Sequence, residues 1–464
     1  MTELKTEALT NRPGRSAGRS LGRFTPSHPL VRGGLIVGAG IVLGNLIGFV
    51  RVAVTAYLLG TKAYADVLAV ALGPLDAFNG ALINTMIFAF VPMITLQGES
   101  ERYAFFVAAR RLFISIFGAM TVATAAFAPW LISVLGPGLP GDGAREAAYL
   151  LRVISLSTMM AGTAAIYSAW LYTKRRFGPT AFYQALLNVF TIAGALLLWR
   201  FIGIFGFAIG YTAGSCAQLL LVYLASREDL RDARADSADP GRPVSWQELI
   251  GKPGIFLAYA GLLAVNMIVT RAYATHAGTG MAAAFDYCIR CVNVVIAYLV
   301  SPASNSLLPE IARLHAAGED RKAVRLVDRT AGYASIAAVV ACAIGIVVRT
   351  PIIALLFQRG SFTAQSTELV SGVFLGLAPC LIGYSLLELT ARSLFALNRP
   401  MLPLIAALFP VTVNVLVSGL LRQLAPERFA QPEYVGIGAS AGLLAGFAVL
   451  IISAHLQRRL SARQ

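Results

Sequence analysis

Long apolar runs recur along this chain, and each is long enough to cross a bilayer, which takes about 20 apolar residues. In lipid such a run is stable as a helix, because a helix satisfies its own backbone hydrogen bonds. By length and by the turn residues between them, the runs lie near 33–58, 66–95, 104–135, 147–172, 180–199, 202–225, 251–275, 280–309, 327–349, 367–396, 400–421 and 434–456. The sequence therefore predicts an all-α polytopic membrane protein with about twelve transmembrane helices.

Composition and charge agree with a membrane protein. The chain has 464 residues, of which 57% are hydrophobic and 13% charged, whereas a soluble protein has about 25% charged residues. The net charge is +15, but the basic residues are spread over short loops between apolar runs. There they set membrane topology rather than bind nucleic acid, and their distribution predicts that both termini are cytoplasmic.

The polar segments divide the chain into parts. We predict a disordered basic cytoplasmic tail over 1–31, a cytoplasmic linker over 226–247 and a short tail over 458–464. Between them lie two bundles of six helices, 32–225 and 248–457. An even number of helices in each bundle gives both the same orientation, so their pseudo-symmetry axis runs along the membrane normal with a cleft between them.

Short motifs recur in the two halves in the same order, which supports an internal duplication. The pairs are Phe90-Val-Pro92 with Leu307-Leu-Pro309, Trp130-Leu-Ile-Ser-Val-Leu with Pro351-Ile-Ile-Ala-Leu-Leu, and Leu171-Tyr-Thr-Lys-Arg-Arg-Phe-Gly-Pro179 with Leu394-Phe-Ala-Leu-Asn-Arg-Pro400.

Ionisable residues inside apolar runs are the candidates for function, because a charge at the bilayer centre costs roughly 2.5–3.5 kcal/mol on insertion scales. They are Arg51, Asp66, Asp76, Arg152, Arg271, Asp286, Arg290, Glu388 and Arg392. Arg51 and Arg290 lie in the first and eighth runs, one in each half. Two guanidinium groups that face one cavity suit a diphosphate, since arginine binds phosphate oxygens bidentately.

The alternative for these arginines is a structural ion pair. Arg51 would then pair with Asp66. Arg290 would pair with Asp286, four residues earlier on the same helix face.

The other charged groups also have two interpretations. Asp76, Asp286 and Glu388 either couple transport to an ion or form ion pairs. Asp76 follows Pro74 and would cap a broken helix, and Arg271 would extend to the outer membrane surface.

No pattern in the sequence indicates an enzyme. There is no P-loop, hydrolytic triad or cluster of metal-ligand residues, so we expect a transporter with no metal site and no cofactor. Cys288 and Cys291 form a CxxC inside an apolar run, where they are small core residues. Breaks at Gly73-Pro74, Ala378-Pro379 and Phe409-Pro410 would mark either hinges or fixed kinks.

Several motifs resemble those of the MurJ/MviN lipid II flippases of the MOP exporter superfamily. They are Leu46-Ile-Gly-Phe-Val-Arg51, Tyr57-Leu-Leu-Gly60, Ala65-Asp66, Phe90-Val-Pro92, Ser306-Leu-Leu-Pro309 with Arg290 upstream, and Leu356-Phe-Gln-Arg-Gly-Ser-Phe-Thr363. The resemblance covers most of residues 33–457.

The resemblance implies two helical bundles in a V around a central cavity, in a bacterial inner membrane. It implies that an undecaprenyl-pyrophosphate-linked saccharide crosses from the inner to the outer leaflet by alternating access. Arg51 and Arg290 match two cavity arginines of the family, and Asp66 matches an acidic residue.

By this resemblance, the chain would be a short and divergent member of the family. It has Asn45, Phe78 and Asn79 where the family usually has arginines, and it lacks two further C-terminal helices. Asn45 and Asn79 would therefore line a less basic substrate site.

Other functions keep the same scaffold. Lipid II is the leading cargo, and the alternatives are an exopolysaccharide or O-antigen repeat unit, or a drug exported by cation coupling. A membrane polymerase or ligase would need a large outward loop, which the chain lacks. A scaffold for cell-wall or polysaccharide synthesis proteins is another class. The energy source would be the membrane potential or a coupling ion.

Overall fold

A computed structural model describes residues 29–236, 246–299, 307, 310–311, 313–397 and 399–461. The predicted N-terminal tail up to residue 28 and the linker segment 237–245 lie outside these residues. The described residues form helices and turns without a strand. This confirms the all-α fold class.

The first half of the chain forms one bundle. Its helices are α1 (Pro29–Leu59), α2 (Ala63–Leu96), α3 (Glu99–Ala126), α4 (Ala128–Leu135), α5 (Gly141–Thr173), α6 (Phe177–Ile202) and α7 (Phe205–Asp236). They pack mainly as α2 on α5, α1 on α6, and α5 and α6 on α7. We call this group the N bundle.

The second half forms the C bundle. Its helices are α8 (Trp246–Ala277), α9 (Met281–Leu299), α11 (Asp320–Phe357), α12 (Ala364–Leu377), α13 (Cys380–Ala396), α14 (Met401–Ala406), α15 (Leu408–Leu424), α16 (Pro426–Phe429), the short 3₁₀ turn η1 (Pro432–Tyr434) and α17 (Ile437–Ser461). Helix α15 packs on α17 and α8, and α11 packs on α12 and α13.

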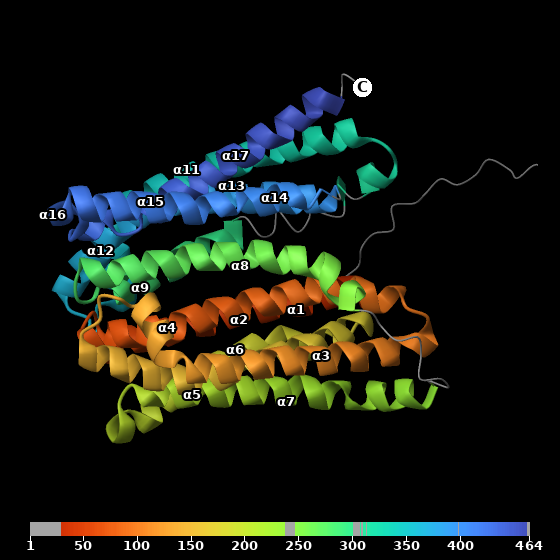
Figure 1. Ribbon diagram of the computed structural model, residues 1–464, viewed down its shortest axis with the longest axis horizontal. Coiled ribbons are helices and arrows are strands. Elements are labelled where there is room, and N and C mark those ends of the chain that lie inside the picture. The colour runs from red at the N-terminus through yellow and green to blue at the C-terminus, as the bar shows by residue number, and fades with distance from the viewer. Residues whose placement is uncertain are drawn as a thin grey trace, which may run out of the picture.

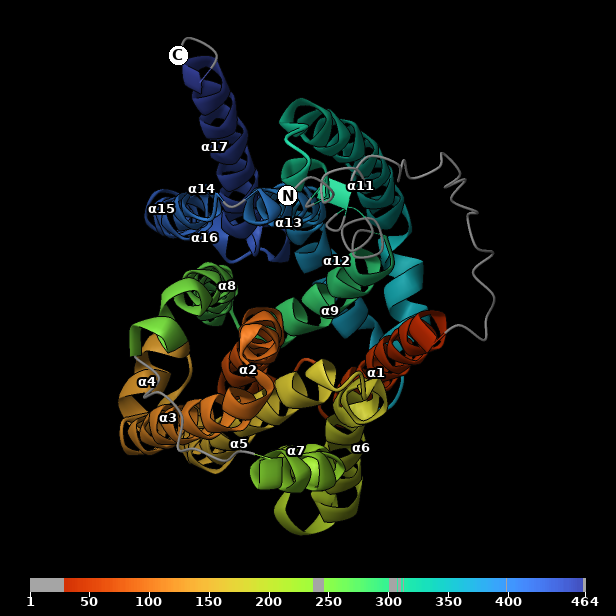
Figure 2. The ribbon, with the colours of Figure 1, turned by 90° about the vertical axis from the view of Figure 1, so that its right-hand side faces the viewer.

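The two bundles lie side by side with their helices along the long axis of the molecule (Figure 1). The end-on view separates α3, α5, α6 and α7 on one side from α11, α13, α15 and α17 on the other (Figure 2). Helix α2 lies between them and contacts both α8 and α9. The first two helices of each half therefore form most of the junction.

Apolar length makes this a multi-pass membrane protein. Within the described residues, nine helices are long and apolar enough to span a membrane, or ten if the bent pair α12–α13 is one span. The helices lie along the twelve predicted runs, but the nine or ten that are long and apolar enough are fewer than the twelve predicted transmembrane helices. Helix α11 shows the lipid-facing surface clearly, because Val347 and Leu355 remain 78% and 70% exposed.

The proline positions have different effects. Ala378-Pro379 breaks the tenth run, where α12 and α13 meet at 43°. Helix α2 is continuous through Pro74, so the chain does not leave the helix there and the prediction that Asp76 caps a broken helix is wrong. The break near Phe409-Pro410 falls at Ala407, which separates α14 from α15.

The ends of the two bundles differ from the predicted boundaries. Helix α7 continues to Asp236, so half of the predicted linker 226–247 is helical. Helix α1 begins at Pro29, inside the predicted tail, and α17 continues to Ser461. Polar residues extend α7 and α17 beyond their apolar runs, which is why composition alone placed these two ends too early.

Candidate functional site

Two buried ion pairs lie at the junction of the bundles, one from each half. Arg51 on α1 pairs with Asp76 on α2 at 2.6 Å. Arg271 on α8 pairs with Asp286 on α9 at 2.5 Å. In each half an arginine on the first helix therefore meets an aspartate on the second. The two pairs also act on each other electrostatically, since Asp286 attracts Arg51.

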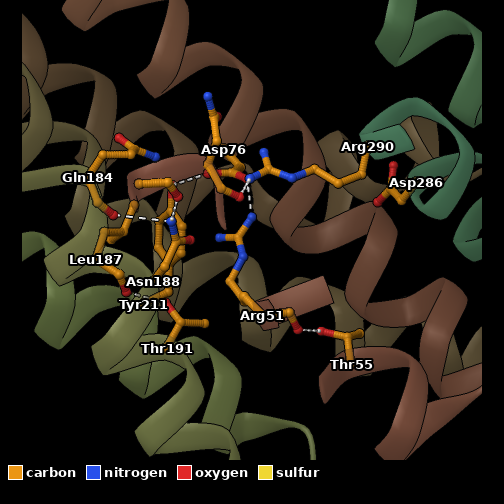
Figure 3. A network of polar contacts seen from close by, with 12 residues as sticks. Arg51, Thr55, Asp76, Gln184, Leu187, Asn188, Thr191, Tyr211, Asp286 and Arg290 are labelled. Atoms are coloured by element: carbon orange, nitrogen blue, oxygen red, sulfur yellow. Dashed lines mark hydrogen bonds and ion pairs between the residues drawn. The ribbon is translucent and has the colours of Figure 1, made fainter. Parts of the chain in front are cut away.

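In the N-bundle pair, Asp76 accepts a second hydrogen bond and Arg51 has a donor that is not used. The Tyr211 hydroxyl on α7 donates to Oδ1 of Asp76 at 3.0 Å, so Asp76 is held by two helices (Figure 3). Arg51 donates to Asp76 through Nη2. Its Nη1 is buried and has no hydrogen-bond partner among the described residues.

The C-bundle pair is more enclosed. Arg271 donates to Oδ1 of Asp286 through both Nε, at 3.0 Å, and Nη2. Its guanidinium lies on Gly73 of α2, where an added Cβ would be 2.6 Å from Cζ. Glycine is needed there because only a residue without Cβ lets the guanidinium approach the helix so closely. The prediction that Arg271 reaches the outer surface is wrong.

Arg290 crosses from the C bundle to the N bundle. Its Nη2 donates to the main-chain carbonyl of Asn45 on α1 at 3.2 Å, and its guanidinium fills the space beside Gly48. Figure 3 shows this side chain extending from α9 toward Asp76, on which its charge also acts. We call Arg51, Asp76, Arg271, Asp286 and Arg290 the charge network. Three arginines against two aspartates give it a formal charge of +1.

The carboxylates of the charge network are more accessible than the guanidinium groups they bind. The side chains of Asp76 and Asp286 are 31% and 26% exposed, whereas those of Arg51 and Arg271 are 10% and 5% exposed. Arg290, like the two aspartates, is half-buried.

The partners of the predicted residues differ from the alternative considered from sequence. Arg51 pairs with Asp76, not with Asp66. Asp286 pairs with Arg271, whereas the alternative from sequence paired it with Arg290. Asp76, Asp286 and Glu388 are each in an ion pair, as one of the two interpretations predicted.

Three predicted residues lie outside the charge network. Asn79 is buried and donates to the Ser157 hydroxyl on α5 at 3.2 Å. Glu388 on α13 pairs with Arg392 at 2.7 Å and accepts from Tyr259 on α8. Asp66 is buried and accepts from the main-chain N–H groups of Gly280 and Ala283, the latter at 2.9 Å.

Asp66 belongs to a set of contacts that join the bundles at one end. In addition, Ser361 N–H donates to the Tyr57 carbonyl at 2.8 Å, and the Tyr287 hydroxyl donates to the Gly60 carbonyl at 2.7 Å. The Thr61 and Ser366 hydroxyls lie 2.9 Å apart. We call this region, residues 57–66 with 280–287 and 361–366, the interlocked end.

Comparisons with known proteins agree with the observed fold. The family model described as "Lipid II flippase MurJ" matches residues 55–463. The chain belongs to the MurJ family. A probable lipid II flippase MurJ of Rhizobium meliloti is 26% identical over 92% of this chain and 82% of its own length. A lipid II flippase MurJ of Burkholderia cenocepacia is 24% identical over 79% of this chain and 73% of its own length.

Solved structures of the superfamily share the fold. A lipid II flippase MurJ in an inward closed conformation aligns with a TM-score of 0.75 at 18% identity, over 91% of this chain and 87% of its own. An inward-facing MATE family transporter of the MOP superfamily aligns with a TM-score of 0.75 at 13% identity, over 90% of this chain and 95% of its own. At these identities the match establishes the architecture of two helical bundles alone.

The sequence of this MurJ family chain offers Arg271 as a candidate but suggests the surface for it, because it is late in its helix. It gives no signal for Tyr211, which carries no charge and binds Asp76. The repeat offered a signal for Arg271. Arg271 is on the first helix of its half, as Arg51 is, and an aspartate follows on the next helix in both halves. Within the described residues, no three His, Cys, Asp or Glu side chains are grouped to hold a metal ion.

Proposed function

We propose that this MurJ family protein moves an undecaprenyl-pyrophosphate-linked saccharide, with lipid II as the leading cargo, from the inner to the outer leaflet of the bacterial inner membrane. One observation carries the proposal. Arg51 binds Asp76 within the N bundle, and Arg290 extends toward the same side chain from the C bundle (Figure 3). A diphosphate bound there would contact both halves at once.

The arrangement suits alternating access. The diphosphate would bind at the charge network, the polyprenyl tail would stay in lipid, and the bundles would rock about their junction. The hydrogen bonds of the interlocked end join the bundles at one side of the network. Opening that end while closing the other would carry the head group across without exposing its charge to lipid.

The orientation and energy source form part of the proposal. Both termini would be cytoplasmic, so the interlocked end would face outward. The transporter would use no cofactor. The energy source would be the membrane potential, which is worth about 2.3 kcal/mol per charge per 100 mV and would act on the charged cargo. The alternative energy source is a coupling ion.

A related cargo is the second candidate. The positions of the missing family arginines hold Asn45 and Asn79, and Asn79 is buried against Ser157. The resulting site is less basic than the family resemblance implies. This favours an exopolysaccharide or O-antigen repeat unit on the same lipid carrier as the alternative.

The test is rescue of a bacterial strain depleted of its own lipid II flippase. We expect the wild type to restore growth, and Arg51→Ala and Arg290→Ala to lose rescue at equal membrane levels. Arg145→Ala is the matched control, because Arg145 lies in an exposed ion pair with Asp142. If the wild type is present in the membrane and does not rescue, lipid II is not its cargo. If both alanine variants rescue fully, the arginines are not the site.

A further inference from the structure

We propose that Asp76 is an internal competitor for the cargo: its carboxylate occupies the Arg51 guanidinium before binding, yields it to the diphosphate, and takes it back on release. The inference rests on the proposed function, because it assigns a role to the same site. It makes Asp76 a specificity-determining residue. A ligand binds Arg51 only if it holds the guanidinium better than a carboxylate does.

The positions of the two side chains support exchange. Asp76 is three times as exposed as Arg51, at 31% against 10% for the side chains, while their charged atoms are 2.6 Å apart. The aspartate is therefore the more accessible member of this pair. A phosphate that binds Arg51 at Nη2 must displace Asp76 from that nitrogen.

The donors of Arg51 favour a phosphate over the carboxylate in this geometry. Asp76 accepts from Nη2 alone, and the buried Nη1 has no partner among the described residues. A buried donor without an acceptor is unfavourable. A phosphate group has enough oxygens to accept from both nitrogens in a bidentate pair. Exchange would therefore satisfy a donor that the resting ion pair leaves unused.

A second partner keeps displacement reversible. The Tyr211 hydroxyl donates to Oδ1 of Asp76, the oxygen that Arg51 does not bind. After Arg51 is taken by cargo, Asp76 keeps this hydrogen bond and stays near the guanidinium. It can then compete for Arg51 again when the cargo must leave.

The pair in the other bundle also has a carboxylate more exposed than its guanidinium and a buried Nη1 without a partner among the described residues, but no tyrosine hydroxyl donates to its carboxylate. Asp286 is bound by two nitrogens of Arg271, whose side chain is 5% exposed and packs on Gly73. We expect this pair to stay formed when cargo binds. The two pairs are alike in position, but the N-bundle pair alone combines an exposed carboxylate with a second donor from a tyrosine.

Binding of undecaprenyl pyrophosphate to purified protein in detergent micelles tests the inference. We expect Asp76→Asn to bind at least about tenfold more tightly than the wild type, and Asp76→Glu, which keeps the competitor, to bind like the wild type. Tyr211→Phe should bind several-fold more weakly, because displaced Asp76 loses its remaining partner. Asp142→Asn is the matched control, since Asp142 pairs with Arg145 on the exposed surface.

Uncharged undecaprenol, measured alongside, separates phosphate exchange from a general change in lipid affinity. Tighter binding of the pyrophosphate alone by Asp76→Asn supports the inference, as does weaker binding by Tyr211→Phe should Asp76→Asn not fold. Wild-type binding with no gain in folded Asp76→Asn overturns the inference and leaves the proposed function standing. An equal gain for undecaprenol also overturns it. Absence of pyrophosphate binding in both proteins overturns the proposed function and the inference together.

Discussion

At the scale of single residues, Arg51 on α1 pairs with only one of the two aspartates in the first half of α2. Asp66 and Asp76 lie on one helix, separated by about 15 Å at 1.5 Å per residue, so they cannot both reach Arg51. Which one does depends on how α1 and α2 are offset, and that offset is set by packing. The same holds for Arg271, whose place near a helix end suggested the surface. Gly73, on a helix that is distant in the sequence but packed against α8, makes room for it in the interior.

Removing Arg271 should destabilise the protein more than any surface arginine does. Arg271→Ala would leave the half-buried Asp286 without its partner; breaking a fully buried pair costs roughly 3–5 kcal/mol, and the cost here is lower because Asp286 is 26% exposed. Thermal unfolding in detergent measures the effect. Arg145→Ala should change it little, because exposed ion pairs contribute about 0–1 kcal/mol. Equal unfolding temperatures for the two variants would show that the Arg271 pair is not structural.

At the scale of elements, apolar length predicted where the helices lie, but the prolines predicted only some of the breaks between them. Pro379 separates two helices, whereas Pro74 lies inside a continuous one. Neighbouring side chains decide between these outcomes, so the local sequence does not. The role of Asp66 was equally hidden. It binds the start of α9, more than two hundred positions along the chain, where a carboxylate is favoured by the N–H groups and dipole of a helix N-terminus.

Asp66→Asn should loosen the interlocked end, because the amide carries no charge to bind the first turn of α9. We expect faster labelling of Thr61→Cys by a maleimide reagent in this variant, in a background without the five native cysteines. Lys62→Cys provides the matched site, since Lys62 is exposed already and should label equally with and without the change. Unchanged labelling of Thr61→Cys would mean that Asp66 does not hold this end closed.

At the scale of the whole molecule, the length of the apolar runs and the order of the motifs predicted the two bundles and the family. Each bundle is a set of apolar helices whose order follows from the chain, so length and punctuation suffice. The junction did not follow, because its contacts join residues far apart in the sequence. Thr61 meets Ser366, and Gly60 meets Tyr287. A pattern read from one sequence carries no information on which state of the junction is formed.

A disulfide across the interlocked end should stop transport if the bundles must separate there. The Thr61 and Ser366 hydroxyl oxygens are 2.9 Å apart, so cysteines at both positions are close enough to bridge. In a cysteine-free background, we expect the oxidised double variant to lose rescue of the depleted strain and to regain it with a reductant. Each single cysteine variant should rescue under both conditions. Rescue that persists with the disulfide formed would show that the interlocked end stays closed during transport. The cargo would then have to leave by another route between the bundles.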